Sequence, residues 1–204
     1  MQSSAFLTIS DLWIERGEKD LCKRLSFDVF AGDIVRILGE NGAGKSSLLK
    51  VISGAMSPLE GRVFYGGLEV TNDRHSLQEN TLYLGHSAGV KKVLTVEENL
   101  RWYCPLASSS EVHFALERLG LLSLLDSPVG ALSAGQIRRV ALSRLWLSKQ
   151  KIWLLDEPFV SLDAEGVGIL EKRIMQHTES GGAVVLTTHQ DLVSLHSRDI
   201  SLSV

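Results

Sequence analysis

The stretch Gly39-Glu40-Asn41-Gly42-Ala43-Gly44-Lys45-Ser46 has the spacing GxxxxGK[ST], and it lies between an apolar run over residues 34–38 and an amphipathic segment from Ser47 to Ile52. Glycines in such a loop let successive backbone N–H groups turn toward an anion at a helix start, where the peptide dipoles favour negative charge. Lys45 is then placed to reach the β- and γ-phosphates of a nucleotide, and the Ser46 hydroxyl to hold Mg²⁺. We expect the whole run from Gly39 to Ser47 to contact a nucleoside triphosphate.

A second short apolar run ends in two acids. Residues 151–155 read KIWLL and are followed by Asp156 and Glu157. This pattern predicts a buried parallel strand whose carboxyl end faces the ligand crevice. Asp156 is placed there to help hold Mg²⁺, and Glu157 to orient and deprotonate an attacking water. Taken alone, the run is equally compatible with a solvated acidic loop after a core strand.

A third motif lies just before that strand. Residues 132–136 read LSAGQ, so Ser133 is followed by Gln136 at the spacing of a capping box, and apolar residues then recur at helical spacing. The motif predicts a second helix start that can bind an anion. On its own, a capping box usually marks only the beginning of a helix.

The order of these motifs, with LLDEP after LSxGQ and a histidine after a later strand, resembles that of the ATP-binding cassette (ABC) ATPases over essentially the whole chain. The resemblance implies ATP with Mg²⁺, a D-loop that contains Asp163, and a switch histidine, His189, that contacts the γ-phosphate and takes part in catalysis. In that family Ser133 and Gly135, with Gln136 beside them, would complete the ATP site of the opposite subunit. The family thus implies a head-to-tail homodimer that encloses two ATP molecules.

Two positions depart from the family pattern. His86 stands where most ABC ATPases have a glutamine near Mg²⁺ and the attacking water, and an imidazole can bind a metal or a water but lacks the paired donor and acceptor of an amide. Arg16 stands where an aromatic residue usually stacks on adenine. Because guanidinium planes also stack on rings, we interpret Arg16 as a substitute, although a solvent-exposed turn residue is an equal alternative.

The remaining sequence predicts one α/β domain of the P-loop class. Strand-like segments at 6–14, 25–30, 33–38 and 62–65 alternate with glycine turns and indicate an antiparallel β layer, whereas residues 96–125 follow a helical pattern. We expect a single ATP-binding domain over residues 1–204. Its nucleotide core would span about 1–85 and 150–204, and its helical subdomain about 86–149.

Composition excludes several classes of function. With 204 residues the chain has room for one cassette, and its net charge of −3 gives no footprint for nucleic acid. Neither a membrane-spanning run nor a signal peptide is indicated. The two cysteines, Cys22 and Cys104, are interpreted as free thiols, and the six histidines lack metal-ligand spacing. The resemblance to ABC ATPases implies that the chain is peripheral, on the cytoplasmic face of the inner membrane, with an integral membrane permease as partner.

The residues around these motifs narrow the resemblance. Segments such as LGH at 84–86, LWL at 145–147 and DEPF at 156–159 are similar to those of ABC ATPases that serve haem export in cytochrome c maturation. Three alternatives stay open: the ATPase of another exporter, for a drug, lipid or peptide; a soluble ABC protein of DNA repair or translation; and a nucleotide-binding regulator without turnover. The soluble class usually carries a coiled-coil insert or a second cassette, and intact Glu157 and His189 argue against the regulator.

Overall fold

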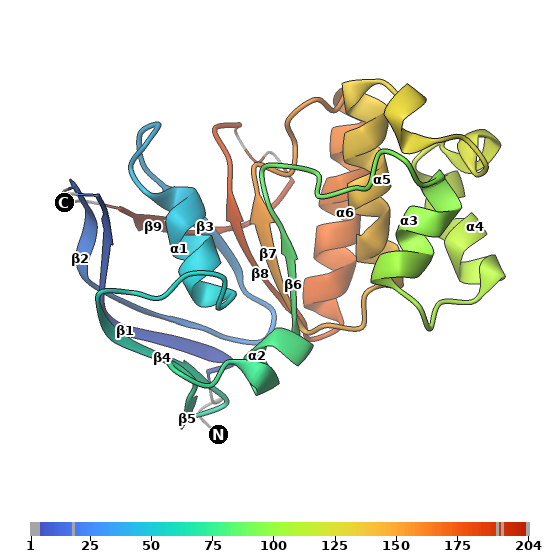
Figure 1. Cartoon of the computed structure of the whole chain (residues 1–204). Coiled ribbons are helices and arrows are strands. Elements are labelled where there is room, and N and C mark those ends of the chain that lie inside the picture. Colours follow the sequence, from blue (N-terminus) through green and yellow to red (C-terminus); the bar gives the residue numbers. More distant parts are fainter. Residues whose placement is uncertain (1–4, 18, 191, 193, 203–204) are drawn as a thin grey trace.

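The computed structural model describes residues 5–17, 19–190, 192 and 194–202, so the first four residues of the amino-terminal stretch lie outside it. Two sheets and a set of helices make up this part of the chain (Figure 1). The antiparallel sheet has the order β2 (Lys19–Val29), β1 (Leu7–Arg16), β4 (Glu60–Tyr65), β5 (Leu68–Glu69). The parallel sheet has the order β6 (Thr81–Leu84), β7 (Ile152–Asp156), β8 (Ala183–Thr187), β3 (Ile34–Leu38), β9 (Arg198–Ser201).

The antiparallel sheet confirms the expected β layer, but its strand β2 is longer than predicted. β1 and β2 form a hairpin in which Arg16 pairs with Lys19, so β2 begins six residues before the predicted start at Leu25. Its first half reads KDLCKR, and the charged residues hide the alternation that marks a strand. Arg24 also has a φ of +53°, which shows that the strand is irregular there. Cross-strand pairing therefore decides the conformation of this segment.

Two hydrophobic cores lie on opposite faces of the parallel sheet. One core joins the antiparallel sheet, α1 (Lys45–Ile52) and α2 (His75–Glu79) to one face of β3, β7 and β8. The other joins α3 (Val96–Tyr103), α4 (Ser109–Arg118), α5 (Ala134–Leu147) and α6 (Ala164–Glu179) to the opposite face. Figure 1 shows α1 on one side of the sheet and α5 and α6 on the other. Since both faces are covered, every residue of β7 and β8 is buried.

The segment predicted as helical over 96–125 is divided into short helices. α3 begins at a capping box between Thr95 and Glu98 and ends before Pro105, which cannot donate a helical hydrogen bond. α4 begins at a second capping box, between Ser108 and Glu111. Two 3-10 turns follow, at Leu122–Leu124 and Val129–Ala131, before α5 starts.

The topology brings four strand ends together. β3 leads into the glycine loop and α1, β6 ends at Leu84 just before His86, and β7 ends at Asp156. β8 ends at Thr187, two residues before His189. Because the strands are parallel, their carboxyl ends meet at one edge of the sheet. Among the described residues, no helix is both long and apolar enough to cross a membrane.

Candidate functional site

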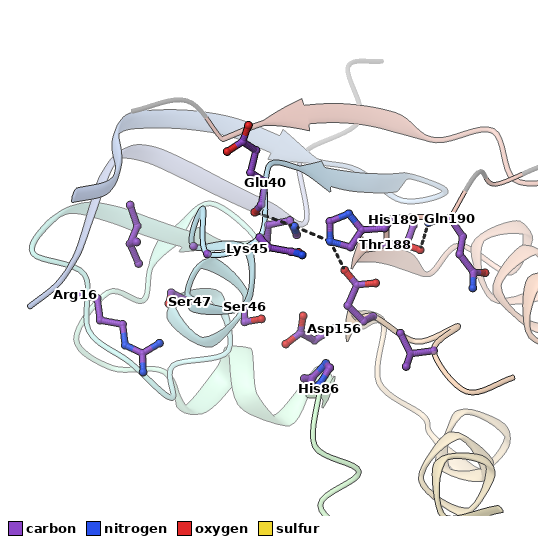
Figure 2. A pocket seen from close by; sticks show the side chains of 16 residues that line it. Arg16, Glu40, Lys45, Ser46, Ser47, His86, Asp156, Thr188, His189 and Gln190 are labelled. Carbon is purple, nitrogen blue, oxygen red and sulfur yellow. Dashed lines mark hydrogen bonds and ion pairs between the residues drawn. The ribbon is translucent and has the colours of Figure 1, made fainter. Parts of the chain in front are cut away.

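A cleft of about 500 Å³ opens at this edge of the sheet. It combines residues from the glycine loop, α1 and the ends of β1, β6, β7 and β8 (Figure 2). The lining residues are Arg16, Leu21, Glu40, Asn41, Gly42, Gly44, Lys45, Ser46, Ser47, His86, Asp156, Glu157, Val160, Thr188, His189 and Gln190. Most of the residues predicted to bind nucleotide or metal therefore share one cleft.

The glycine loop has the conformation that its composition predicts. Gly42 and Gly44 have φ values of +82° and +100°, in the left-handed region that favours glycine. A β-carbon on Gly44 would lie 2.7 Å from the Cβ of Leu21, so a larger residue would push the loop away from β2. Gly44 is also the N-cap of α1, and no side chain caps this helix. The first-turn N–H groups of α1 are therefore left for a ligand.

Lys45 lies at the start of α1 and is 9% exposed. Its Nζ donates to the carbonyls of Gly39, at 2.7 Å, and Glu40, at 3.2 Å, and lies 3.2 Å from His189 Nε2. The same His189 nitrogen is 3.5 Å from Glu157 Oε1. One nitrogen cannot accept from Lys45 and donate to Glu157 at once, so the shorter contact makes Nε2 an acceptor. Figure 2 shows these contacts as a line across the cleft.

Asp156 and Glu157, at the end of β7, are held by different contacts. Asp156 is 2% exposed, and its Oδ1 accepts a 2.9 Å hydrogen bond from the hydroxyl of Thr187 on β8. The same hydroxyl accepts a 2.9 Å hydrogen bond from the backbone N–H of Glu157. Glu157 has a φ of +48°, which is unusual for a residue with a side chain. This turn directs the side chain of Glu157, 14% exposed, into the cleft beside His189.

The two residues that depart from the family pattern both line the cleft. His86 is exposed, and Figure 2 shows its ring beside Asp156, facing the same space as Ser46. Arg16 lies at the end of β1, on the other side of the loop from His189 (Figure 2). Burial and the nearby charge of Asp156 raise the pKa of Tyr83, just before His86, to about 12, so this phenol stays neutral.

Other predicted residues lie outside the cleft. The side chain of Ser133 accepts from the N–H of Gln136 at 3.3 Å, and the side chain of Gln136 accepts from the N–H of Ser133 at 2.9 Å. Gly135 packs near Ser161, where an added β-carbon would lie 3.1 Å from the carbonyl. Asp163 caps α6 and forms a 2.7 Å ion pair with Arg139. Gly39 and Ala43 shape the loop without lining the cleft.

Four lining residues were not among the predicted ones. Leu21 and Val160 supply apolar walls, and Thr188 and Gln190 flank His189. The sequence carries a signal for the last two, since both adjoin a strand-end histidine at the ligand edge. Leu21 gives no such signal, because its position depends on the early start of β2.

Comparisons with known proteins agree with this geometry. The sequence profile of the ABC transporter family matches residues 22–160. The chain is 47% identical over 189 residues to the cytochrome c biogenesis ATP-binding export protein CcmA of Pseudomonas putida, covering 91% of this chain and 90% of that protein. It is 45% identical over 199 residues to CcmA of Escherichia coli O157:H7, covering 97% and 96%. A solved ABC transporter ATP-binding protein of Pyrococcus furiosus has a TM-score of 0.82 and 30% identity, with 96% of each chain covered.

The cleft and these matches define an ATP-binding and ATP-hydrolysing subunit of the ABC transporter family, to which the chain belongs. Within that family it groups with the ATP-binding export proteins of cytochrome c biogenesis, which are 42% to 47% identical to it over most of their length.

Proposed function

We propose that this chain hydrolyses ATP to drive an export complex that moves or releases haem during the maturation of c-type cytochromes. The identity of 47% to a cytochrome c biogenesis export protein, over nine-tenths of both chains, carries this proposal. The complex would include an integral permease subunit of the CcmB type. The chain would bind that subunit peripherally, on the cytoplasmic face of the inner membrane.

The phosphates of ATP would lie on the loop from Gly39 to Ser47. The uncapped start of α1 offers N–H groups to the phosphate oxygens, and Lys45 adds a mobile positive charge. Lys45 would exchange its loop carbonyls for the β- and γ-phosphates. Arg16, beside the apolar Leu21, would pack on the adenine ring.

Glu157 is proposed as the general base, since its carboxylate reaches the cleft from a fixed backbone. A water O–H bond breaks, the proton passes to Glu157, and the water oxygen forms a bond to the γ-phosphorus. The bond from that phosphorus to the bridging oxygen of ADP then breaks. His189 would turn from Lys45 toward the γ-phosphate.

Mg²⁺ fits the oxygen donors of the cleft. Ser46 and Asp156 both face it, and Asp156 is oriented by Thr187. Among the described residues no group of three or more His, Cys, Asp or Glu side chains could hold a metal ion alone, which suits a cation that takes its other ligands from phosphates and water. When bound, Mg²⁺ would neutralise developing phosphate charge. His86 would contact it through a water, because Mg²⁺ prefers oxygen ligands.

A head-to-tail dimer would complete the site. Ser133 is exposed, and Gly135 and Gln136 are partly exposed, at a helix start outside their own cleft. Asp163 lies beside Arg139, its ion-pair partner on that helix, α5. In the dimer the second chain would supply these groups to the ATP of the first. We retain the division into a nucleotide core and a helical subdomain over about 86–149 as part of this proposal.

The permease would bind the segment between His86 and α4. Three large apolar side chains there are exposed: Val93 at 89%, Trp102 at 63% and Leu106 at 89%. The connecting loop is held by Asn99, whose side chain bonds the backbone of Lys91 in both directions, at 2.7 Å and 2.9 Å. His86 adjoins both this segment and the ATP cleft, so it would carry movement between them.

Glu157→Gln in the purified chain tests the hydrolytic assignment. It keeps the shape of the side chain but removes the base, so turnover should fall at least about 100-fold while ATP binding persists. The variant should accumulate as an ATP-bound dimer in size-exclusion chromatography. Turnover near that of the wild type would overturn the assignment of the base.

A cellular experiment tests the biological assignment. Cells that carry Lys45→Ala or Glu157→Gln in place of the native chain should assemble the membrane complex but lack haem-stained c-type cytochromes, while b-type cytochromes remain. Affinity purification from native membranes should recover the permease. Normal c-type cytochromes in such cells would leave only the broader class, an ABC ATPase with another cargo.

A further inference from the structure

Arg138, on α5 five residues after Ser133, makes an unusual set of hydrogen bonds. Its side chain is buried, with 6% of the residue exposed. Nη2 donates to the carbonyl of Asp156 at 2.9 Å and to that of Glu157 at 2.7 Å. Nη1 donates to the carbonyl of Gly85 at 3.0 Å and, more weakly, to that of His86 at 3.4 Å. A single guanidinium therefore contacts two loops that both line the ATP cleft.

The four carbonyls form two pairs with a common geometry. The carbonyls of Asp156 and Glu157 belong to the two peptide planes that flank the Cα of Glu157. Likewise, the carbonyls of Gly85 and His86 belong to the planes that flank the Cα of His86. Because the planes on either side of a Cα define φ and ψ, each nitrogen of Arg138 restrains the backbone of one cleft residue.

Glu157 needs such a restraint. Its φ of +48° lies in the left-handed region, where a residue with a side chain pays on the order of 1 kcal/mol. The hydroxyl of Thr187 fixes the N–H of Glu157, and Arg138 fixes the two carbonyls around it. All three polar backbone groups around this Cα are therefore bonded to side chains of other elements.

The positive charge of Arg138 faces backbone carbonyls, and it does not pair with a carboxylate. Burial lowers the pKa of Arg138, and the charges of Asp156 and Glu157 oppose that shift. The guanidinium stays protonated, as arginine does in proteins. Among the described residues its hydrogen-bond acceptors are all backbone carbonyls, and it forms no ion pair. Arg138 thus leaves the carboxylates of Asp156 and Glu157 to their partners in the site, Thr187 and His189.

We propose that Arg138 is a positioning residue for ATP hydrolysis, which sets the backbone of Glu157 and of His86 from the helix that begins at Ser133. The proposal rests on the role of Glu157 proposed above and adds the group that holds it in place. Arg138 is not among the residues that line the cleft. It acts by keeping the base and the His86 loop at a fixed separation.

The test compares purified Arg138→Met, Arg138→Gln and Arg138→Lys with the wild type. Methionine keeps the unbranched apolar part of the side chain but removes every donor, so kcat should fall about 10- to 100-fold while the KM for ATP changes less than about 3-fold. Glutamine and lysine keep hydrogen-bond donors but are shorter than arginine, so each should recover only part of the lost kcat. The matched control is Arg173→Met, which removes a partly buried arginine that donates to the carbonyl of Leu145, far from the cleft.

A structural role alone would give a different pattern. If Arg138 only stabilised the fold, Arg138→Met and Arg173→Met would lose kcat in proportion to their loss of folded protein, measured by thermal unfolding. Should Arg138→Met fail to fold, Arg138→Gln decides, and a kcat within about 2-fold of the wild type would overturn the proposal.

Parallel measurements on Glu157→Gln separate the two proposals. If Glu157→Gln keeps its turnover, the base assignment fails whatever Arg138 does. If Glu157→Gln is inactive and Arg138→Met has wild-type kcat, only the positioning role fails. The double variant should still form the ATP-dependent dimer, because the hydrogen bonds of Arg138 in the described part of the chain go to residues 85, 86, 156 and 157 and not to the glycine loop. Loss of that dimer in a folded double variant would show a role in closing the dimer around ATP and contradict the proposal.

Discussion

The two helices that begin at sequence motifs, α1 and α5, start in opposite ways. α1 follows a left-handed glycine, and no side chain satisfies its first N–H groups. α5 follows Ser133, and the reciprocal bonds of Ser133 and Gln136 satisfy two of its N–H groups. α1 therefore offers the N–H groups of its whole first turn to an anion, whereas the cap of α5 satisfies the N–H groups of Ser133 and Gln136 and not those of Ala134 and Gly135. α5 also offers the hydroxyl hydrogen of Ser133, because that oxygen acts as acceptor in the cap.

This difference assigns separate tasks to the two helix starts. α1 should determine whether one chain holds ATP at all, and α5 should determine whether two chains close around it. Variants at each start should then affect different measurements.

Lys45→Ala, at the start of α1, should have the largest effect on ATP binding. The ammonium group makes charge-assisted hydrogen bonds worth about 1.5–3 kcal/mol to a phosphate, so its loss should weaken ATP affinity about 10- to 100-fold. Titration calorimetry with the isolated chain measures this directly. Lys50→Ala, an exposed lysine in the last turn of the same helix, is the matched control and should bind like the wild type. Equal affinity of both variants would contradict the task assigned to α1.

Ser133→Ala, at the start of α5, should leave ATP affinity within about 2-fold and weaken the ATP-dependent dimer about 10-fold or more, the value of a hydrogen bond to a charged group. The dimer is best measured in the Glu157→Gln background by light scattering. Ser108→Ala is the control, because Ser108 forms the same kind of capping box at the start of α4, away from the cleft. A dimer unaffected by Ser133→Ala would argue against head-to-tail assembly.

Most features of the two helix starts could be predicted from the sequence. The glycine loop, the acids after β7 and the capping box at Ser133 are local patterns, in which a few adjacent residues determine both conformation and chemistry. The strand-end positions of His86 and His189 follow from a parallel sheet. These features depend little on the rest of the chain.

The hydrogen bonds from Arg138 to the two cleft loops could not be predicted in the same way. Residues 85 and 156 are joined to it only by the packing of α5 against β6 and β7, so nothing adjacent to Arg138 in sequence indicates its partners. The pair Arg138-Arg139 reads as a solvated basic face, whereas Arg138 is buried and Arg139 pairs with Asp163. Likewise, nothing adjacent in sequence indicates that Trp13 lies half-buried, with its indole N–H bonded to Asp20 at 2.6 Å.

Ser133→Ala and Ser108→Ala should also be compared for stability. Replacing a serine N-cap by alanine costs about 1 kcal/mol, so the two variants should lose similar unfolding free energies in urea. Equal losses would show that any difference in dimer formation comes from the hydroxyl of Ser133 and not from a frayed helix. A much larger loss for Ser133→Ala would instead make the dimer effect a consequence of local unfolding.

The smallest predicted effect is a loss of stability at low pH. It determines the pH at which variants of α1 and α5 should be compared. Burial lowers the pKa of His177, on α6, to about 4. A hydrogen bond to the carbonyl of Lys151 opposes this lowering, and the nearby charge of Arg173 adds to it. Its ring stacks on Trp153 with centroids 3.7 Å apart. The folded chain therefore keeps His177 neutral, whereas the unfolded chain binds a proton below about pH 6.5. Stability should be fully present above that pH and decline as the pH falls toward about 4.

Because the ring is partly exposed, the loss between about pH 7.5 and 6.0 should be only about 0.5 kcal/mol. Urea unfolding at the two pH values measures it, with His177→Phe as the control that keeps a stacked ring but cannot titrate. His177 lies at the junction of α6, β7 and β8, away from both helix starts, so acid should lower the unfolding free energies of Lys45→Ala and Ser133→Ala by the same amount. A pH dependence retained by His177→Phe would assign the effect to another group, and the comparison of α1 with α5 would then need to be confined to neutral pH.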